Sequence, residues 1–327
     1  MSALVGAFSR MVDPAVVVVF NGVFRQAGQI HDKIFRVVKA QNYITETTAN
    51  VGLTKARYRP EQDSITYEEF LQGDGKNLTQ YEYAVGTKIS SKLAKWNKLG
   101  AVKALVASSA NAVARRRAFD ATKKLERSDA TSYTHTTDGS TVIDLTGGDA
   151  LAAQSASHTT TRTSSTVNNV IRDGTTNNMD IAEDALEAAE TVTAPSITDE
   201  SDEVMEYELD TLFSSRKNSW KAMRLLKTSA GRVGTPNHDI NLVYGRYQYH
   251  KLPYMDTARD DYWFLMDRKM NESIEAGFLY IEGSNGIEKD GPYVDFDSKT
   301  IKYSWAYEVA MGHNEWRPLL VSQGDNT

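Results

Sequence analysis

The residues of this sequence that could carry chemistry are scattered, and their spacings match no catalytic motif. The six histidines stand apart, and no two have the i, i+4 spacing of a helical metal site. Gly147-Gly148-Asp149 and Gly73-Asp74-Gly75 are typical of turns and not of phosphate-binding loops. No Gly-x-Ser-x-Gly sequence occurs, so a nucleophile elbow is not predicted. We therefore expect no catalytic residue, no cofactor, no metal ion and no enzymatic activity.

Charged residues cluster in three places. Asp260-Asp261 and the acidic run 199–210 could serve acid–base or cation-binding roles, but the run lacks the central Gly and terminal Glu of an EF-hand loop. Solvated acidic surface is the simpler interpretation. A basic run at 216–232 follows and could pair with the acidic run across a turn near Phe213 to Arg216. The third cluster, at 115–117, could contact a polyanion or form the solvated end of a helix, and it comprises Arg115, Arg116 and Arg117.

Composition narrows the function classes. The chain has 327 residues and a net charge of −6, which argues against a generally basic nucleic-acid binder. It has no cysteine, so disulfides, thiolate chemistry, cysteine-ligated zinc and iron–sulfur clusters are excluded. The apolar run 15–20 is far shorter than a membrane span of about 18 residues, and Asp13-Pro14 interrupts any signal-peptide pattern. We expect a protein that is soluble and intracellular when made, with residues 15–20 in a strand or at the start of a helix.

A long helix is predicted from Ser90 to Arg127. The stretch has no proline and one glycine, Gly100, and at about 1.5 Å per residue it would approach 50 Å. Most of its cations lie off the apolar face, so the helix is expected to be half-buried. The apolar face contains Leu93, Trp96, Leu99, Val102, Leu105, Val106, Ala110 and Val113, at steps of three and four.

A two-stranded hairpin is predicted before this helix, within residues 41–88, which are rich in β-forming residues. Gln72 to Lys76 is a strong turn signal between Thr66–Phe70 and Thr79–Tyr83, two runs that alternate polar and aromatic residues. An isolated hairpin is marginally stable in water, so we expect this one to lie on another surface, which could be that of another subunit. Its aromatic residues could stack nucleic-acid bases, but they are more typical of interface anchors: Tyr67, Phe70, Tyr81 and Tyr83.

The other segments complete an α+β plan. Residues 1–40 are predicted to include a short amphipathic helix ending near Ala40, and the polar tract 128–178 to be loop-rich and partly β. A helix is expected from Asp180 to Val192. Strands are expected within 240–256, 261–266, 274–281 and 300–311, with a turn at Gly283 to Gly286. The last strand has the clearest period of two, with Ile301, Tyr303, Trp305, Tyr307 and Val309 on one face.

The order of elements resembles tailed-bacteriophage major capsid proteins of the Hong Kong 97-type fold. Tyr81 to Ser90, running straight into the long helix, looks like the return strand of that family's extended E-loop entering its spine helix. Asp138-Gly139 and His158 are similar to turns of Mu-like head subunits, and the ending Tyr307 to Gly324 resembles the family's closing strand and turn. The resemblance covers most of residues 20–322, although the Thr/Ser-rich tract at 140–178 departs from it.

The resemblance implies a domain plan. It assigns residues 1–40 to an N-terminal arm, 41–88 to the E-loop hairpin and 89–178 to a peripheral (P) domain that contains the spine helix and polar crossing. Residues 179–284 would form an axial (A) domain, and 285–327 would be the return strands of the P domain and the C-terminus. Each E-loop would lie over the P domain of a neighbouring copy, and the long helix would face packaged DNA.

The implied role is structural: a major capsid protein that self-assembles through pentamers and hexamers into the icosahedral shell around a double-stranded DNA genome. Assembly would occur in the host cell cytoplasm and the protein would reside in the virion, without a membrane. Partners would be other copies, scaffold, portal and decoration proteins, and non-specifically held DNA beside Arg115, Arg116 and Arg117. A nanocompartment shell protein and a DNA-binding protein are the alternatives. Around a ring of copies, opposed charges would meet: Glu203, Glu206 and Asp210 against Lys217, Lys221 and Arg224.

Overall fold

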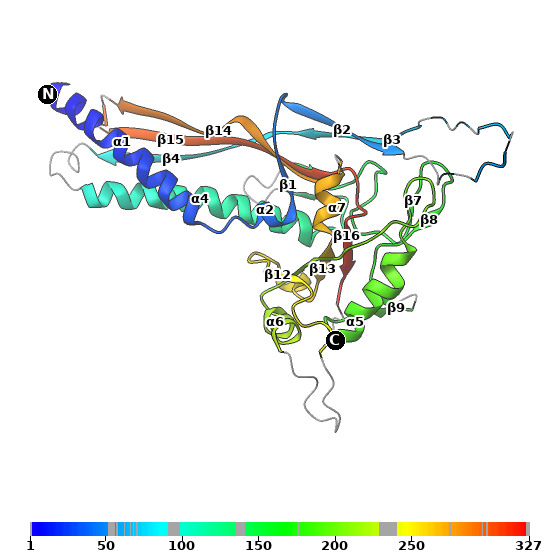
Figure 1. The fold of residues 1–327 in the computed structure, drawn as a ribbon. Coiled ribbons are helices and arrows are strands. Elements are labelled where there is room, and N and C mark those ends of the chain that lie inside the picture. Colours follow the sequence, from blue (N-terminus) through cyan, green and yellow to red (C-terminus); the bar gives the residue numbers. More distant parts are fainter. Residues whose placement is uncertain are drawn as a thin grey trace.

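The computed structural model describes residues 2–324 apart from 52–55, 57, 62, 66, 68, 70, 91–98, 135–140, 175–176, 229–240, 275, 296 and 299. Its longest feature is a four-stranded sheet with the order β1-β14-β15-β4. The long strands β14 (Phe278–Asp295), β15 (Thr300–His313) and β4 (Tyr81–Ser90) are antiparallel neighbours. The short strand β1 (Arg36–Lys39) pairs in parallel with β14. Two long helices, α1 (Ser2–Gln26) and α4 (Leu99–Glu126), run along one face of this sheet (Figure 1).

The core between the sheet and the helices follows from the period of two in β15. The predicted face from Ile301 to Val309 is buried, which confirms the strand prediction. Trp305 on this face stacks against Phe20 of α1, with ring centroids 4.9 Å apart. The apolar face of α4 closes the same core through Val102, Val106, Ala110 and Val113.

The structure corrects two helix predictions. Leu105 is 38% exposed while Val106 is fully buried, because the buried face of α4 steps from Val102 to Val106 to Ala110 and leaves Leu105 beside it. The predicted helix ending near Ala40 is also wrong. The long α1 comes earlier, the four-residue α2 (His31–Ile34) follows, and β1 occupies residues 36–39 because its valines pair with the edge of β14. No helix in the described part of the chain is long and apolar enough to cross a membrane.

The projecting hairpin uses different strands from those predicted. Strand β2 (Ile44–Val51) pairs antiparallel with β3 (Leu71–Thr79), and the expected turn at Gln72 to Lys76 lies inside β3. Gly73 in this segment is needed for the close approach of β2 and not for a turn, because a Cβ at this position would lie 2.8 Å from the Ala49 carbonyl oxygen. Tyr81 and Tyr83 belong to β4 in the long sheet, so they are not on this hairpin.

A second four-stranded sheet, of order β12-β11-β13-β16, forms the lower body in Figure 1. Its central strand β11 (Thr211–Ser214) is parallel to β12 (Gln248–Lys251) and antiparallel to β13 (Trp263–Met266), and β16 (Leu319–Ser322) completes the sheet. The sheet packs with α5 (Glu183–Ala188), its irregular continuation to Ser196, and α6 (Ser219–Lys227). The turn expected near Phe213 to Arg216 lies slightly later, at residues 216–218, because Phe213 is a fully buried residue of β11.

The remaining segments link the two sheets. The polar tract is loop-rich and partly β, as predicted, with short strand pairs at β5 (Ser132–Thr134) and β6 (Val142–Asp144), β7 (His158–Thr159) and β8 (Thr166–Val167), and β9 (Arg172–Asp173) and β10 (Asn177–Asn178). A 3-10 turn, Thr257–Arg259, and α7 (Arg268–Ser273) flank β13. The motif Asp138-Gly139 lies outside the described residues.

Sheet membership differs from the expected boundary at residue 284. Strand β14 already begins at Phe278 and runs through the predicted turn at Gly283 to Gly286, where its pairing with β15 shifts register. The C-terminal strand β16 returns to the second sheet. The chain therefore crosses from the second sheet to the first near residue 277 and crosses back after residue 313.

Candidate subunit-contact surface and its polar junction

The hairpin β2–β3 presents the most exposed aromatic surface that the structure describes. It extends from the end of the long sheet (Figure 1), and Tyr58 and Tyr67, in the segment between its strands, are 91% and 87% exposed. Tyr43 and Ile44 at the start of β2 are also exposed. Phe70, the other predicted contact on this segment, lies outside the described residues. Such a surface buries little apolar area within its own chain, so it is suited to covering another protein surface.

The base of the hairpin, in contrast, is held by the same chain. Leu78 of β3 is buried against Leu279, Ile281 and Ala310. It fits there because Gly312 has no side chain: a Cβ at that position would lie 2.2 Å from a methyl carbon of Leu78. The expectation that the hairpin needs another subunit therefore applies to its outer part and not to its base.

Asn314 connects three segments at this base. Its side-chain Nδ2 donates to the carbonyl oxygens of Thr47 in β2 (3.1 Å) and Asp74 in β3 (2.9 Å). Its own carbonyl oxygen accepts a hydrogen bond from the Gly148 amide of the polar tract at 3.1 Å. A Cβ on Gly148 would overlap the Asn314 side chain, so this glycine is required by close approach. Lys76 adds a second tie by binding Asp144 and the Thr146 hydroxyl.

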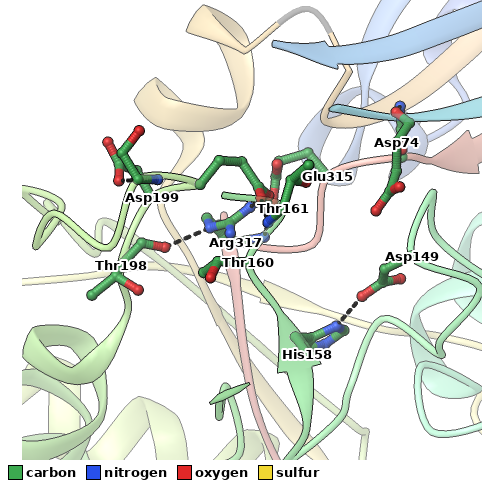
Figure 2. Close-up of polar contacts among 12 residues, drawn as sticks. Asp74, Asp149, His158, Thr160, Thr161, Thr198, Asp199, Glu315 and Arg317 are labelled. Carbon is green, nitrogen blue, oxygen red and sulfur yellow. Dashed lines mark hydrogen bonds and ion pairs between the residues drawn. The ribbon is translucent and has the colours of Figure 1, made fainter. Parts of the chain in front are cut away.

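A buried histidine stands beside this contact. His158 is fully buried, and its Nδ1 lies 2.5 Å from Asp149 Oδ2 (Figure 2). Its ring stacks on that of Trp316, with 3.8 Å between the ring centroids. The Gly-His-Asn-Glu-Trp-Arg-Pro segment that ends β15 thus packs onto the polar tract. His158 has a structural position in this arrangement, because Trp316 stacks on its ring and Asp149 contacts one edge of it.

Arg317 is the central cation of the junction. Its Nη1 lies 2.7 Å from both Glu200 and Glu315, and its Nε donates to the Thr198 carbonyl oxygen at 2.6 Å (Figure 2). Burial disfavours the charged guanidinium, but Glu315 and Glu200 outweigh burial and raise the pKa of Arg317. The acidic run 199–210 is therefore partly an internal partner of the C-terminal segment, and not simply solvated surface as its composition indicated.

The structure separates the three arginines that the sequence grouped. Arg117 is only 4% exposed, bound to Glu282 at 2.8 Å and packed over Tyr280 and Tyr307. Arg116 is paired with Asp120 at 2.7 Å. Both readings of the cluster, polyanion contact and solvated helix end, are wrong for Arg117, because successive residues of a helix point about 100° apart. Arg115 alone is exposed.

Burial also shapes the electrostatics of this part of α4. Burial raises the pKa of the Asp120 carboxyl to about 6, although Arg116 opposes the shift. Burial likewise raises the pKa of Tyr83 to about 12. Tyr83 stacks on Tyr307 and lies beneath Arg116, so it is a packing residue of the long sheet. Among the described residues, no group of three or more His, Asp or Glu side chains is placed to hold a metal ion.

The opposed charge blocks do not pair with each other where the structure shows their partners. Lys217 binds Asp260 and Asp261, at 3.2 and 2.8 Å, and Lys221 binds Asp180 at 3.1 Å. In the acidic block, Glu208 binds Lys269 and Asp210 accepts the Thr211 hydroxyl. The predicted pairing across a turn is wrong because β11 separates the two blocks. Asp260-Asp261, assigned to acidic surface, is instead a partner of Lys217.

Sequence reasoning missed the roles of Asn314 and Arg317. Both lie in a segment whose sequence indicates only a closing strand and turn. The available signal was the density of polar and aromatic residues between Gly312 and Pro318, because such residues are retained in buried segments when their hydrogen bonds are satisfied. Apart from Glu315, the partners of these two side chains lie more than 100 residues away in sequence, so no local spacing identifies them.

Comparisons with known proteins match at the level of structure. No protein-family model and no curated protein matches the sequence. The capsid structure of the cyanophage P-SCSP1u has a TM-score of 0.56 at 10% identity, over 92% of this chain and 89% of that chain. The capsid of an empty GTA particle has a TM-score of 0.54 at 12% identity, over 91% and 90% of the chains. A Mycobacterium phage Cain structure has a TM-score of 0.53 at 12% identity, over 92% and 91%.

These matches span nearly the whole chain and nearly the whole of each matched chain. The protein therefore has the fold of phage capsid proteins, the Hong Kong 97-type α+β fold that the sequence resemblance predicted.

Proposed function

We propose that this chain is a major capsid protein that self-assembles into the icosahedral shell around the double-stranded DNA genome of a tailed phage. The observation that carries the proposal is the fold match over about nine-tenths of the chain to capsids of a cyanophage and of a GTA particle. The role is structural, and assembly into the virion takes place in the host cell. Other copies of the chain, arranged in hexamers and pentamers, are its principal partners.

The hairpin supports this proposal independently of the comparisons. Its base is fixed by Asn314 and Leu78, while Tyr58 and Tyr67 are almost fully exposed. An extended element that is fixed at its base and carries exposed aromatic residues toward its end is suited to lie across an adjacent copy. In the shell, this surface would be buried against the long sheet or helices of the neighbouring subunit.

The two sheets support a proposed division of the subunit. The long sheet with α1 and α4 would form the arm and peripheral body, the hairpin would be the E-loop, and the β12-β11-β13-β16 sheet would be the axial body. With this division the axial body includes residues 319–322, because β16 pairs with β13. Glu206 and Arg224, two exposed members of the charge blocks, remain proposed contacts around the ring, as do Glu203 and Asp210. Lys217 and Lys221 are also exposed and remain proposed contacts, although each has a carboxylate partner in its own chain. Scaffold, portal and decoration proteins are further proposed partners.

Electron microscopy of the expressed full-length chain tests the proposal. Closed, uniformly sized shells, or curved sheets of hexamers and pentamers, are the expected result. A chain that stays monomeric at high concentration, alone and with its neighbouring phage genes co-expressed, would overturn it. Shells that instead enclose a dedicated protein cargo and come from a gene outside any phage cluster would identify the nanocompartment alternative.

A further inference from the structure

A cleft of about 410 Å³ lies where three separate parts of the chain meet: the α1–α2 connection, α4, and the end of β12. Three exposed cations line it, each from a different element: Lys33 from α2, Arg115 from α4 and Lys251 from β12. No aspartate or glutamate is in the lining. In a chain with a net charge of −6, this is a local concentration of one sign of charge.

These three cations differ from three buried or half-buried cations of α4. Arg116, Arg117 and Lys123 all have carboxylate partners. No ion pair joins Lys33, Arg115 or Lys251 to any acid within the described ranges. The nearest acid in sequence to Lys33 is Asp32, and it lies 2.9 Å from the His31 ring. The cleft therefore gathers positive charge that the chain itself does not neutralise.

Neutral and titratable groups in the same lining add hydrogen-bonding capacity. His250 is partly buried, and its Nε2 has no hydrogen-bond partner among the residues described. Burial lowers the pKa of His250, and the charges of Lys33 and Arg268 lower it further. An anion in the cleft would offset those charges and could accept a hydrogen bond from this ring. Asn111 and Tyr254 line the cleft as well.

We propose that this cleft binds phosphate groups, held by Lys33, Arg115 and Lys251, with His250 as a hydrogen-bond donor. A guanidinium and two ammonium groups that line one cleft without a competing carboxylate match the charge and the several acceptor oxygens of phosphate. The volume lies within the range of small-ligand sites, about 300–1,000 Å³, so the cleft accommodates more than one phosphate group. The phosphates come from the backbone of DNA or from a free oligophosphate. DNA as the source rests on the proposed function, whereas the cleft itself does not.

The test compares two triple variants with the same change of charge. K33Q/R115Q/K251Q removes the cations of the cleft. K39Q/K88Q/K103Q removes three exposed cations on β1, β4 and the opposite part of α4, outside the lining. Full-length, unassembled protein is titrated with a fluorescent DNA duplex and, separately, with inorganic triphosphate, over a series of salt concentrations. Circular dichroism confirms that each variant is folded, and R115K serves as a charge-preserving variant.

We expect the cleft variant to bind the DNA duplex at least about tenfold more weakly than wild type. The slope of the logarithm of the binding constant against the logarithm of the salt concentration should become shallower by about 2 to 3, since each phosphate contact contributes about 0.9 to it. The matched variant should change less than about threefold, and R115K should retain most binding. If triphosphate displaces the bound duplex only weakly, DNA is the source of the phosphate groups that the cleft binds. If triphosphate binds tightly, the source is the free anion. Equal losses of affinity in both triple variants, or no binding by the wild-type protein, would overturn the proposal that this cleft binds phosphate. Shell formation is scored separately by sedimentation, so a chain that binds phosphate but forms no shell refutes the proposed function alone.

Discussion

The Asn314 side chain donates a hydrogen bond to the backbone carbonyl oxygen of Asp74 at 2.9 Å, across 240 residues of sequence. The same amide group also reaches Thr47 on the partner strand. One buried side chain thus forms hydrogen bonds to both strands of the projecting hairpin and connects them to the end of β15. The direction in which the hairpin leaves the body is therefore set within the subunit.

Replacing Asn314 with Ala should loosen this connection. Two backbone carbonyl groups would lose their partner, which costs about 1–3 kcal/mol when such groups stay buried. We expect a lower free energy of unfolding and faster amide hydrogen exchange in residues 71–79, measured by mass spectrometry. Asn21→Ala, at an exposed position of α1, is the control and should leave both unchanged. Unaltered exchange in β3 of the Asn314 variant would contradict the role given to this residue.

Neighbouring positions on α4 should respond in opposite ways to a charge. Val106→Asp places a carboxylate in the core between α4 and the long sheet, at a cost of several kcal/mol, so the protein should not fold. Leu105→Asp, at a position 38% exposed, should stay soluble with a loss of about 1 kcal/mol or less. Soluble yield and thermal denaturation distinguish the two. Similar losses in both variants would show that the buried face of α4 is wrongly placed.

Removing the charge of Arg117 should be far more damaging than removing that of Arg115. Arg117→Gln leaves Glu282 without its cation, at a cost of about 3 kcal/mol, the lower end for buried pairs because Glu282 is 22% exposed. Arg115→Gln should change the free energy of unfolding by less than about 0.5 kcal/mol. The triple change of Arg115, Arg116 and Arg117 to Gln is therefore expected to destabilise the protein strongly. Chemical denaturation of the two single variants and the triple variant measures the loss of unfolding free energy in each. Equal losses in the two single variants would contradict the prediction.

Lys124 should make stability depend on pH. Burial lowers the pKa of its ammonium group to about 7, below the ordinary value of 10.5. The unfolded chain therefore binds more protons between about pH 7 and 10.5, and the free energy of unfolding should rise with pH across that window, by at most about 1.4 kcal/mol per unit. Lys124→Met should flatten this dependence, whereas Lys103→Met, at an exposed position of the same helix, should not. The free energy of unfolding is measured by denaturation at several pH values from 7 to 10. If it rises with pH as steeply in the Lys124 variant as in wild type, the prediction is refuted.

The exposed end of the hairpin should matter for assembly and little for folding. Tyr58→Ser combined with Tyr67→Ser removes aromatic surface that the subunit does not bury, so the melting temperature of the unassembled chain should change by about 1 °C or less. The proportion of protein in shells, measured by sedimentation, should fall severalfold. Shells formed in wild-type yield would show that these tyrosines are not contacts between copies.

Periodicity and local propensity were sufficient for the elements whose pattern is repeated along their length. The alternation from Ile301 to Val309 predicted β15, and the absence of proline over 90–127 predicted the helix that α4 confirms from Leu99 to Glu126. The order of these elements was enough to indicate a capsid fold. Each of these features is local, so the sequence alone carries it.

Pairings and burial at single positions were decided by the tertiary structure. Gly73 and Gly75 fit the sequence pattern of a turn, yet both lie within β3, which pairs with β2. Gly73 is required there for a different reason, because the backbone of β2 leaves little room for a side chain. Arg115 to Arg117 are adjacent in sequence, but the helix turns one toward solvent and another into the core. Asn314 and Arg317 find partners that are far away in the chain. A contact between distant segments depends on how the whole chain packs, and no spacing within a short stretch of sequence encodes it.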